Sequence, residues 1–327
     1  MTYQMLVACY TSNSSQPCPI AFPEMLNMQT INQPTPGVMD ERSLPPGLRL
    51  GPVTLAVADR QRSLAFYRDF LGLSLIEEGT RHGEPTITLG ADGTAIVRLV
   101  VRPGIAPLPR NVTGLFHAAI LLPTRTALAR VVLRLAEVRY PFGASDHAVS
   151  EALYLDDPDG NGLEIYRDRP RDEWVWRDGQ IAMTTIPLDL RSIVDELGDD
   201  EPRWAPMLAG TTLGHIHLRV GDAAEAERFY ADVLGFDVVA RVPGARFLSV
   251  NDYHHHLGAN SWESTGAHAH SEDTAGLIEW ELVLPTIDDM VTTATRLSAA
   301  GVTIDARADG SLDILDPWQT RLVLRTS

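Results

Sequence analysis

An internal repeat constrains the fold of this chain more than any other feature of its sequence. Residues 53–75 (VTLAVADRQRSLAFYRDFLGLSL) align without gaps to residues 216–238 (IHLRVGDAAEAERFYADVLGFDV), at an offset of 163 and with eight identities. A weaker second pair aligns residues 117–138 with residues 279–300 at an offset of 162. Self-similarity of this kind indicates a repeated supersecondary unit. The chain therefore contains four copies of one unit, which we number modules 1 to 4 in chain order.

Each module begins with a strand rich in β-branched and apolar residues, such as VTLAV or IHLRV. Asp59 or Asp222 follows where a carboxylate can accept backbone N–H bonds and so cap a helix. The helix is amphipathic and ends at Gly72 or Gly235, because a helix C-terminus often needs a positive φ. Three further strands complete a βαβββ pattern. This order predicts an α+β fold in which four βαβββ modules pair into two curved-sheet half-barrels.

The repeat also divides the chain into segments. Modules 1 and 2 fill residues 47–168 as an N-terminal domain, and modules 3 and 4 fill residues 209–327 as a C-terminal domain. Residues 169–208 are predicted to form an ordered linker strap with a short helix near 189–197. Residues 1–46 are rich in Pro, Ser, Asn, Gln and Thr and lack apolar periodicity, so we expect a poorly ordered arm there.

Composition excludes several classes of function. The chain has 27 Lys and Arg against 43 Asp and Glu, a formal net charge of −16. Binding to nucleic acid or to an anionic membrane needs a cationic surface, so neither is expected. No apolar run reaches the ~20 residues of a membrane span. The two cysteines, Cys9 and Cys18, argue against a disulfide scaffold and favour a cytoplasmic location.

Positions where the modules differ are the candidates for function. At the start of the first strand, modules 2 and 3 carry His117 and His215. On the last strand, module 2 carries Glu164 where module 4 carries Val323. A carboxylate in an apolar strand is costly unless it is paired or binds a metal. If modules 2 and 3 pair, two imidazoles and one carboxylate converge and leave metal positions open, as in non-haem Fe(II) oxygenases.

Longer motifs carry a family resemblance. The stretch from His147 through Tyr154 and the turn at residues 157–162 to Glu164 resembles the signature of extradiol ring-cleavage dioxygenases. Together with GHIHL and YHHHLGANSW, it makes residues 48–327 similar to the vicinal oxygen chelate superfamily, and within it to the catechol-2,3-dioxygenase type. The resemblance implies two glyoxalase-like domains. It also implies ring cleavage of a small aromatic diol with O2.

The resemblance implies a role for each candidate residue. The metal ligands would be His117, Glu164 and His215, holding Fe(II), with Mn(II) compatible with the same donors. Tyr154 and His147 would hydrogen-bond the oxygens of the substrate. The run His254–His256 resembles the last-strand acid–base histidine of the family. The alignment of HHLGA favours His255 for this role, with the two flanking histidines facing the other way.

Several alternatives stay open at this point. His117 could be a buried strand histidine, and the histidine run could be a surface metal-binding tract. Glu279, which opens module 4, could instead build a site with His215 and His256. The chain could also be another metal-dependent member of the superfamily, such as a hydroquinone-type dioxygenase, isomerase or lyase. A non-enzymatic binding protein of the bleomycin-resistance kind would need no metal triad. A homo-oligomer is compatible with the sequence.

Overall fold

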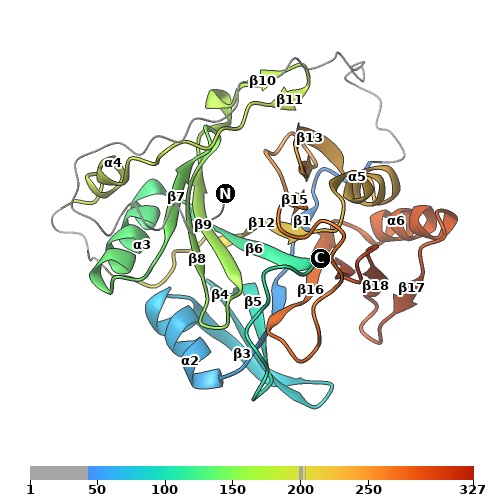
Figure 1. Ribbon diagram of the computed structural model, residues 1–327, viewed down its shortest axis with the longest axis horizontal. Coiled ribbons are helices and arrows are strands. Elements are labelled where there is room, and N and C mark those ends of the chain that lie inside the picture. The colour runs from blue at the N-terminus through green and yellow to red at the C-terminus, as the bar shows by residue number, and fades with distance from the viewer. Residues whose placement is uncertain (1–42, 199–201, 203) are drawn as a thin grey trace.

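The computed structural model describes residues 43–198, 202 and 204–327 of the chain (Figure 1). The predicted poorly ordered arm covers residues 1–46, and residues 1–42 of it lie outside the described residues. Near the end of that segment, Leu44 is buried, and its backbone N–H donates a 2.9 Å hydrogen bond to the carbonyl of Gly235. The described chain therefore begins with a contact to module 3.

Modules 1 and 4 build one sheet of nine strands. Its order is β17-β18-β19-β16-β2-β5-β4-β3, and β1 pairs with β16 off this path. The strands of module 1 and its approach are β1 (Arg49–Leu50), β2 (Val53–Val57), β3 (Ser74–Arg81), β4 (Glu84–Ala91) and β5 (Thr94–Val101). Those of module 4 are β16 (Gly276–Leu284), β17 (Ile304–Ala306), β18 (Leu312–Leu315) and β19 (Arg321–Thr326).

Modules 2 and 3 build the second sheet, of eight strands, in the order β13-β14-β15-β12-β6-β9-β8-β7. Module 2 supplies β6 (Gly114–Leu121), β7 (Gly143–Asp146), β8 (Ser150–Asp156) and β9 (Gly162–Asp168). Module 3 supplies β12 (Thr212–Arg219), β13 (Asp237–Val242), β14 (Ala245–Ser249) and β15 (Leu257–Asn260). The predicted pairing of modules 2 and 3 is confirmed, and so is the α+β architecture with two curved mixed sheets. Each sheet is assembled across the two halves of the chain.

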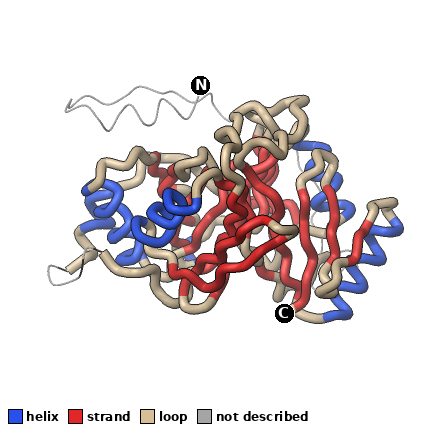
Figure 2. The backbone as a smooth tube through the Cα atoms, turned by 90° about the horizontal axis from the view of Figure 1, so that it is seen from below, coloured by secondary structure: helices blue, strands red, loops and turns tan. Residues whose placement is uncertain are grey.

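The helices lie at the outer sides of the molecule, with the strands of both sheets between them (Figure 2). Modules 1 and 3 each carry an α-helix that continues as a π-helix, whereas modules 2 and 4 each carry one longer helix. The bounds are α2 (Arg60–Leu64) and η1 (Ala65–Phe70), α3 (Arg125–Glu137), α5 (Ala223–Glu227) and η3 (Arg228–Val233), and α6 (Ile287–Ala299). The predicted caps are confirmed: Asp59 accepts from the backbone of Arg62, and Asp222 from that of Glu225.

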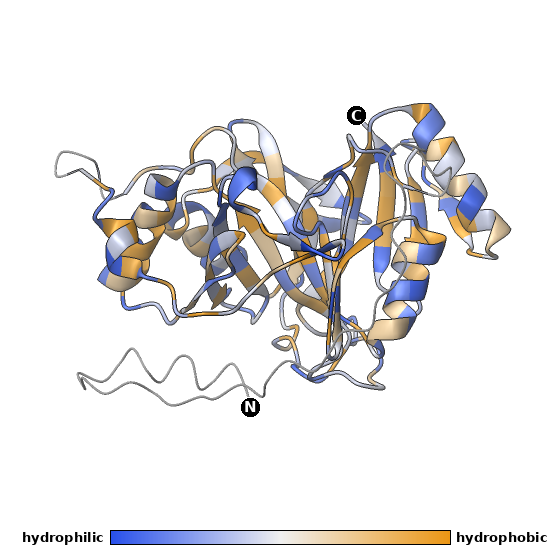
Figure 3. Ribbon diagram, turned by 90° about the horizontal axis from the view of Figure 1, so that it is seen from above, coloured by the Kyte–Doolittle hydropathy of each residue, from blue (hydrophilic) through white to orange (hydrophobic). Residues whose placement is uncertain are grey.

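One continuous hydrophobic core joins the four modules. Its buried side chains come from the first strand of every module and from the helices that cover the sheets. Figure 3 shows hydrophobic residues concentrated along the central strands, while the helices carry a hydrophilic side as well. Apolar strands and two-sided helices are the patterns from which these elements were predicted.

The described part of the segment between the two halves contains several short elements. It contains η2 (Arg171–Glu173), the two-stranded ribbon of β10 (Trp176–Arg177) and β11 (Gln180–Ile181), and α4 (Leu190–Val194). The short helix predicted near 189–197 is α4, and the side chain of Asp189 caps it by accepting from the N–H of Ser192. Within the described part of the chain, every helix is too short or too polar to cross a membrane.

Candidate metal centre

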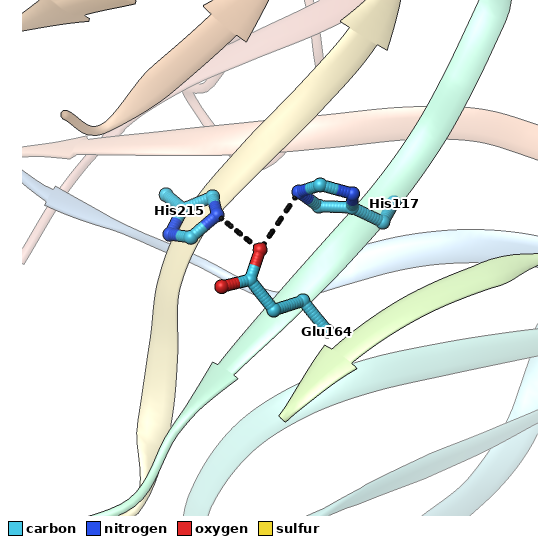
Figure 4. A group of neighbouring side chains, drawn as sticks. All are labelled: His117, Glu164 and His215. Carbon is cyan, nitrogen blue, oxygen red and sulfur yellow. Dashed lines mark hydrogen bonds and ion pairs between the residues drawn. The ribbon is translucent and has the colours of Figure 1, made fainter. Parts of the chain in front are cut away.

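Three neighbouring strands bring His117, Glu164 and His215 to one point (Figure 4). Strand β6 lies between β9, with which it runs parallel, and β12, with which it runs antiparallel. One carboxylate oxygen of Glu164, Oε2, lies 3.0 Å from Nε2 of His117 and 3.0 Å from Nε2 of His215. All three side chains are buried, and their ligand atoms lie within 4.8 Å of one another. The structure thus brings together the three residues that the module comparison selected.

The charges of these groups suit metal binding. Burial alone would raise the pKa of Glu164, but the two imidazoles beside it outweigh burial and hold this pKa well below its usual range. Burial lowers the pKa of His215 to about 4, although the neighbouring Glu164 works in the opposite direction. At neutral pH the pair is therefore a carboxylate and a neutral imidazole. Those are the protonation states in which both groups act as metal ligands.

Buried nitrogen atoms at this point lack hydrogen-bond partners. Nδ1 of His215 has none, and Nε2 of His117 has none either, because its 3.0 Å contact with Glu164 lacks hydrogen-bond geometry. Buried polar groups in folded proteins are usually satisfied, so such exceptions call for an explanation. A divalent cation would satisfy the lone pair of His117 and the carboxylate together. The three residues therefore fit a divalent metal with two nitrogen donors and one oxygen donor.

Module 3 offers no side-chain ligand where module 2 offers Glu164. Strand β15 pairs in parallel with β12 as β9 pairs with β6, so Gly258 occupies the position equivalent to Glu164. A Cβ atom added at Gly258 would lie 2.7 Å from Cγ of His217, closer than real Cβ contacts allow. The glycine thus leaves room for His217 instead of supplying a fourth ligand. A metal held here would keep several positions open for other molecules.

His217 is a residue of this site that the sequence analysis did not single out. It is buried, and its ring centroid lies 4.9 Å from that of His117. Its Nε2 lies 3.0 Å from Nδ2 of Asn260, which can donate to it because Oδ1 of that amide accepts from the N–H of Trp262. The signal was present in the motif GHIHL. Residues two apart on a strand face the same side, so His215 and His217 had to share a face.

Tyr154 lies beside the three candidate ligands, and His147 lies behind it. The ring centroids of Tyr154 and His117 are 5.5 Å apart. The hydroxyl of Tyr154 lies 2.7 Å from Nε2 of His147, whose Nδ1 lies 2.6 Å from the carbonyl of Thr184. Because a carbonyl only accepts, Nδ1 carries the proton and Nε2 of a neutral His147 accepts from Tyr154. His147 therefore reaches the centre through the tyrosine.

The histidine run was predicted on the last strand of module 3, and this prediction is wrong. Strand β15 begins at Leu257, so residues 254–256 lie in the loop before it. The loop turns through Asn251 and Asp252, both of which have a positive φ, and the extended conformation resumes only after the run. The run is also not a surface tract, because His254 and His255 are buried.

The three histidines of the run face different surroundings. The ring centroid of His255 lies 4.1 Å from that of His215, which places His255 at the candidate centre. His256 faces away, and its Nδ1 lies 2.9 Å from the hydroxyl of Ser249. His254 was also expected to face away, but it lies directly behind His255, and its Nε2 is 2.8 Å from the carboxylate of Asp168. Burial lowers the pKa of His255 well below its usual value.

The alternative site built on Glu279 is wrong. Glu279 lies on β16 in the other sheet, fully buried, and its carboxylate accepts hydrogen bonds from Arg81 and Arg307, both at 2.5 Å. It therefore lies in a different sheet from His215, and it is not among the residues whose ligand atoms converge. Where that sheet gathers two histidines around a glutamate, the sheet of modules 1 and 4 gathers arginines.

Comparisons with known proteins agree with this geometry. The family described as Glyoxalase/Bleomycin resistance protein/Dioxygenase superfamily matches residues 49–165 and 212–312. A Bacillus subtilis (strain 168) protein named catechol-2,3-dioxygenase is 41% identical over 273 residues, which are 82% of this chain and 93% of that protein.

Solved structures are similar in fold at low sequence identity. Glyoxalase I from Zea mays matches with a TM-score of 0.53 and 16% identity, over 85% of this chain and 92% of that one. The cppA protein from Streptococcus pneumoniae TIGR4 matches with a TM-score of 0.50 and 9% identity, over 85% of this chain and 100% of that one.

Proposed function

This chain belongs to the glyoxalase/bleomycin resistance protein/dioxygenase superfamily, and from that membership we propose that it is an extradiol ring-cleavage dioxygenase. The substrate would be catechol or a substituted catechol, cleaved with O2 at a mononuclear Fe(II) site. The observation that carries the proposal is the buried convergence of His117, Glu164 and His215. The 41% identical relative named catechol-2,3-dioxygenase supports the same reaction class.

The three residues would hold the metal from one side. Fe(II) bound there would supply a Lewis acid for the two diol oxygens and the redox chemistry that O2 needs. The ionised Glu164 offsets part of the charge of the cation, and the neutral imidazole of His215 donates a lone pair without releasing a proton. Because module 3 supplies no carboxylate at Gly258, the position equivalent to Glu164, the three residues would leave coordination positions for both reactants. Such proximity lowers the entropic cost of their encounter.

His255 and Tyr154 would handle the protons of the substrate. His255 lies next to His215 and is neutral at physiological pH, so it can accept a proton from a diol hydroxyl. Tyr154 stands near His117, with its hydroxyl anchored to His147, where it can orient a substrate oxygen. Both atoms of O2 enter the product, a muconic semialdehyde, so that no external reductant is required.

The position of Gly258 helps to distinguish ring cleavage from the isomerase and lyase reactions of related proteins. A glyoxalase-like isomerase or lyase would use a second carboxylate as its base, and module 3 places a glycine at the position equivalent to Glu164. A binding protein without chemistry would need no buried triad of metal-ligating residues. Both observations support ring cleavage over these alternatives.

The test is reconstitution of the full chain with Fe(II) under anaerobic conditions, followed by catechol and air-saturated buffer. We expect a yellow product with uptake of one O2 per catechol consumed, and a parallel preparation with Mn(II) tests the identity of the metal. Glu164→Gln keeps the size of the side chain and removes its charge, so it should lose both metal and product. One bound iron per chain without oxygen uptake from any catechol would contradict the proposal.

A further inference from the structure

A chain of hydrogen-bonding groups leads away from His255. Its Nδ1 lies 2.9 Å from Nδ1 of His254, and Nε2 of His254 lies 2.8 Å from Oδ1 of Asp168. His254 is fully buried, whereas the side chain of Asp168 is a quarter exposed. This series of hydrogen bonds therefore runs from the candidate centre to the end of β9 near the surface.

The position of Asp168 follows from the alternation of β9. Glu164, Tyr166 and Asp168 are two residues apart on this strand, so they share one face. The first is the candidate carboxylate ligand, and the ring of the second lies 4.9 Å from that of His215. One strand face thus carries both the ligand and the far end of the histidine chain.

When Asp168 is ionised and both imidazoles are neutral, counting protons along this series of hydrogen bonds leaves one assignment. An ionised carboxylate has no proton to donate, so Nε2 of His254 must be the donor to Asp168. A neutral imidazole has only one N–H, so Nδ1 of His254 is then an acceptor. The 2.9 Å contact between the two Nδ1 atoms holds one proton, which must come from His255. His255 is therefore protonated at Nδ1, and its Nε2 keeps a free lone pair.

Tyr253, which contacts Tyr166, also donates a hydrogen bond to Asp168. The hydroxyl of Tyr253 donates to the same Oδ1 at 3.3 Å, and the hydroxyls of Tyr253 and Tyr166 are 2.8 Å apart. Burial raises the pKa of both phenols well above the ordinary value, so both keep their protons and Tyr253 remains a donor. Oδ1 of Asp168 thus accepts hydrogen bonds from Tyr253 and His254, and the two bonds together keep the carboxylate oriented toward His254.

We infer that Asp168 is a positioning residue that, acting through His254, selects the tautomer of His255 with the lone pair on Nε2. In that tautomer His255 can accept a proton from a substrate hydroxyl, whereas a proton already on Nε2 would block it. This use of the tautomer rests on the proposed function. The tautomer itself is a property of the folded chain and does not depend on turnover.

Histidine tautomers can be read directly by NMR. The full chain has ten histidines, and labelling them with ¹⁵N allows protonated and unprotonated ring nitrogens to be separated by chemical shift and ring couplings. We expect wild-type His255, assigned with His255→Gln, to be protonated at Nδ1. Asp168→Ala removes the acceptor for His254 and should convert His255 to a mixture of its two neutral tautomers. Asp168→Asn keeps an oxygen at the same place and should restore the Nδ1-protonated form. Tyr253→Phe is the matched control, since it removes the hydrogen bonds of this hydroxyl to Asp168 and Tyr166 and keeps the contact between Asp168 and His254.

The outcomes are distinct. Protonation of wild-type His255 at Nε2 would overturn the inference, and so would an unchanged tautomer in Asp168→Ala. The wild-type measurement can overturn the inference by itself, even if that variant fails to fold. In the iron-loaded protein we expect Asp168→Ala to lower kcat by about 10- to 100-fold, the usual effect of losing an outer-shell partner, with KM nearly unchanged. If NMR showed the predicted tautomer but the iron-loaded protein cleaved no catechol, the inference about Asp168 would stand and the proposed function would be contradicted.

Discussion

The hydroxyl of Tyr67 donates a 2.8 Å hydrogen bond to the carboxylate of Asp157, which lies in the turn before β9. The second half of the chain repeats the pair, with Tyr230 donating to Asp316 at 2.8 Å. Both tyrosines are fully buried. Tyr67 lies in η1 of module 1 and Tyr230 in η3 of module 3, so each pair joins a helix of one module to a turn of the next module. The two pairs are therefore polar links inside the core.

The pair in the second half should make stability depend on pH. Burial raises the pKa of Asp316 from 3.8 to about 6, despite the hydrogen bonds that it accepts. As pH rises, the unfolded chain loses this proton before the folded one does. The contribution of Asp316 is thus complete below pH 3.8 and is lost as pH rises through 6.

Asp316→Asn removes this titration while keeping the shape of the side chain. The free energy of unfolding of the wild type, relative to that of the variant, should fall by about 2 kcal/mol between pH 4 and pH 7, at 1.36 kcal/mol per pKa unit. Urea unfolding of both proteins across this range provides the measurement. The exposed Asp288→Asn serves as the control and should run parallel to the wild type. Parallel curves for Asp316→Asn would contradict the argument.

The Tyr67–Asp157 link should contribute measurably to stability. Tyr67→Phe removes the donor and leaves a buried carboxylate with fewer partners, so we expect a loss of about 1–3 kcal/mol in the free energy of unfolding. A double-mutant cycle with Asp157→Asn isolates the pairwise energy. If the two losses were simply additive, the hydrogen bond would contribute nothing to joining the modules.

The arginine cluster around Glu279 should be structural and independent of the candidate metal centre. Burial would raise the pKa of Glu279, but its ion pairs with Arg81 and Arg307 hold it below the usual value. Glu279→Ala leaves these partly buried guanidinium groups without their shared partner, and it should cost about 3–5 kcal/mol of stability. Metal content should not change.

An exposed ion pair offers the matched control for that variant. Arg60 and Glu78 lie 2.5 Å apart with side chains that are 50% and 45% exposed. Glu78→Ala should cost less than about 1 kcal/mol, because solvent screens such pairs. Thermal or urea unfolding compares the two variants. Equal losses of stability would contradict the expectation that the buried ion pairs of Glu279 contribute more than the exposed pair.

Metal binding should depend on the three converging residues and not on histidine content in general. Glu164→Gln and His215→Ala should each reduce bound divalent metal by at least about 10-fold after reconstitution and desalting, because each removes one of three protein ligands. His268→Ala, which changes an exposed loop histidine, is the control and should bind like the wild type. Metal analysis by mass spectrometry is the measurement. Full occupancy in Glu164→Gln would show that the metal binds elsewhere.

The sequence by itself determined the modular fold and the residues that converge at the candidate centre. Asp59 and Asp222 cap their helices as the local chemistry requires, and the apolar composition of each first strand indicated that it is buried. Because the modules repeat, His117, Glu164 and His215 stood out as exceptions without any knowledge of distances. Helix capping, strand alternation and repetition are all written within short stretches of chain.

Only the tertiary structure decided which side chains surround those residues. The contact of His254 with Asp168 joins residues 86 apart in sequence, and the arginines that enclose Glu279 come from strands and turns of two modules. The histidine run lies in a loop because a turn at Asn251 and Asp252 precedes it and β15 begins only at Leu257. Such contacts depend on strand register, and a slip of one residue would send every side chain of a strand to the opposite face. Register is fixed by the packing of the whole core, so no local pattern encodes these partners.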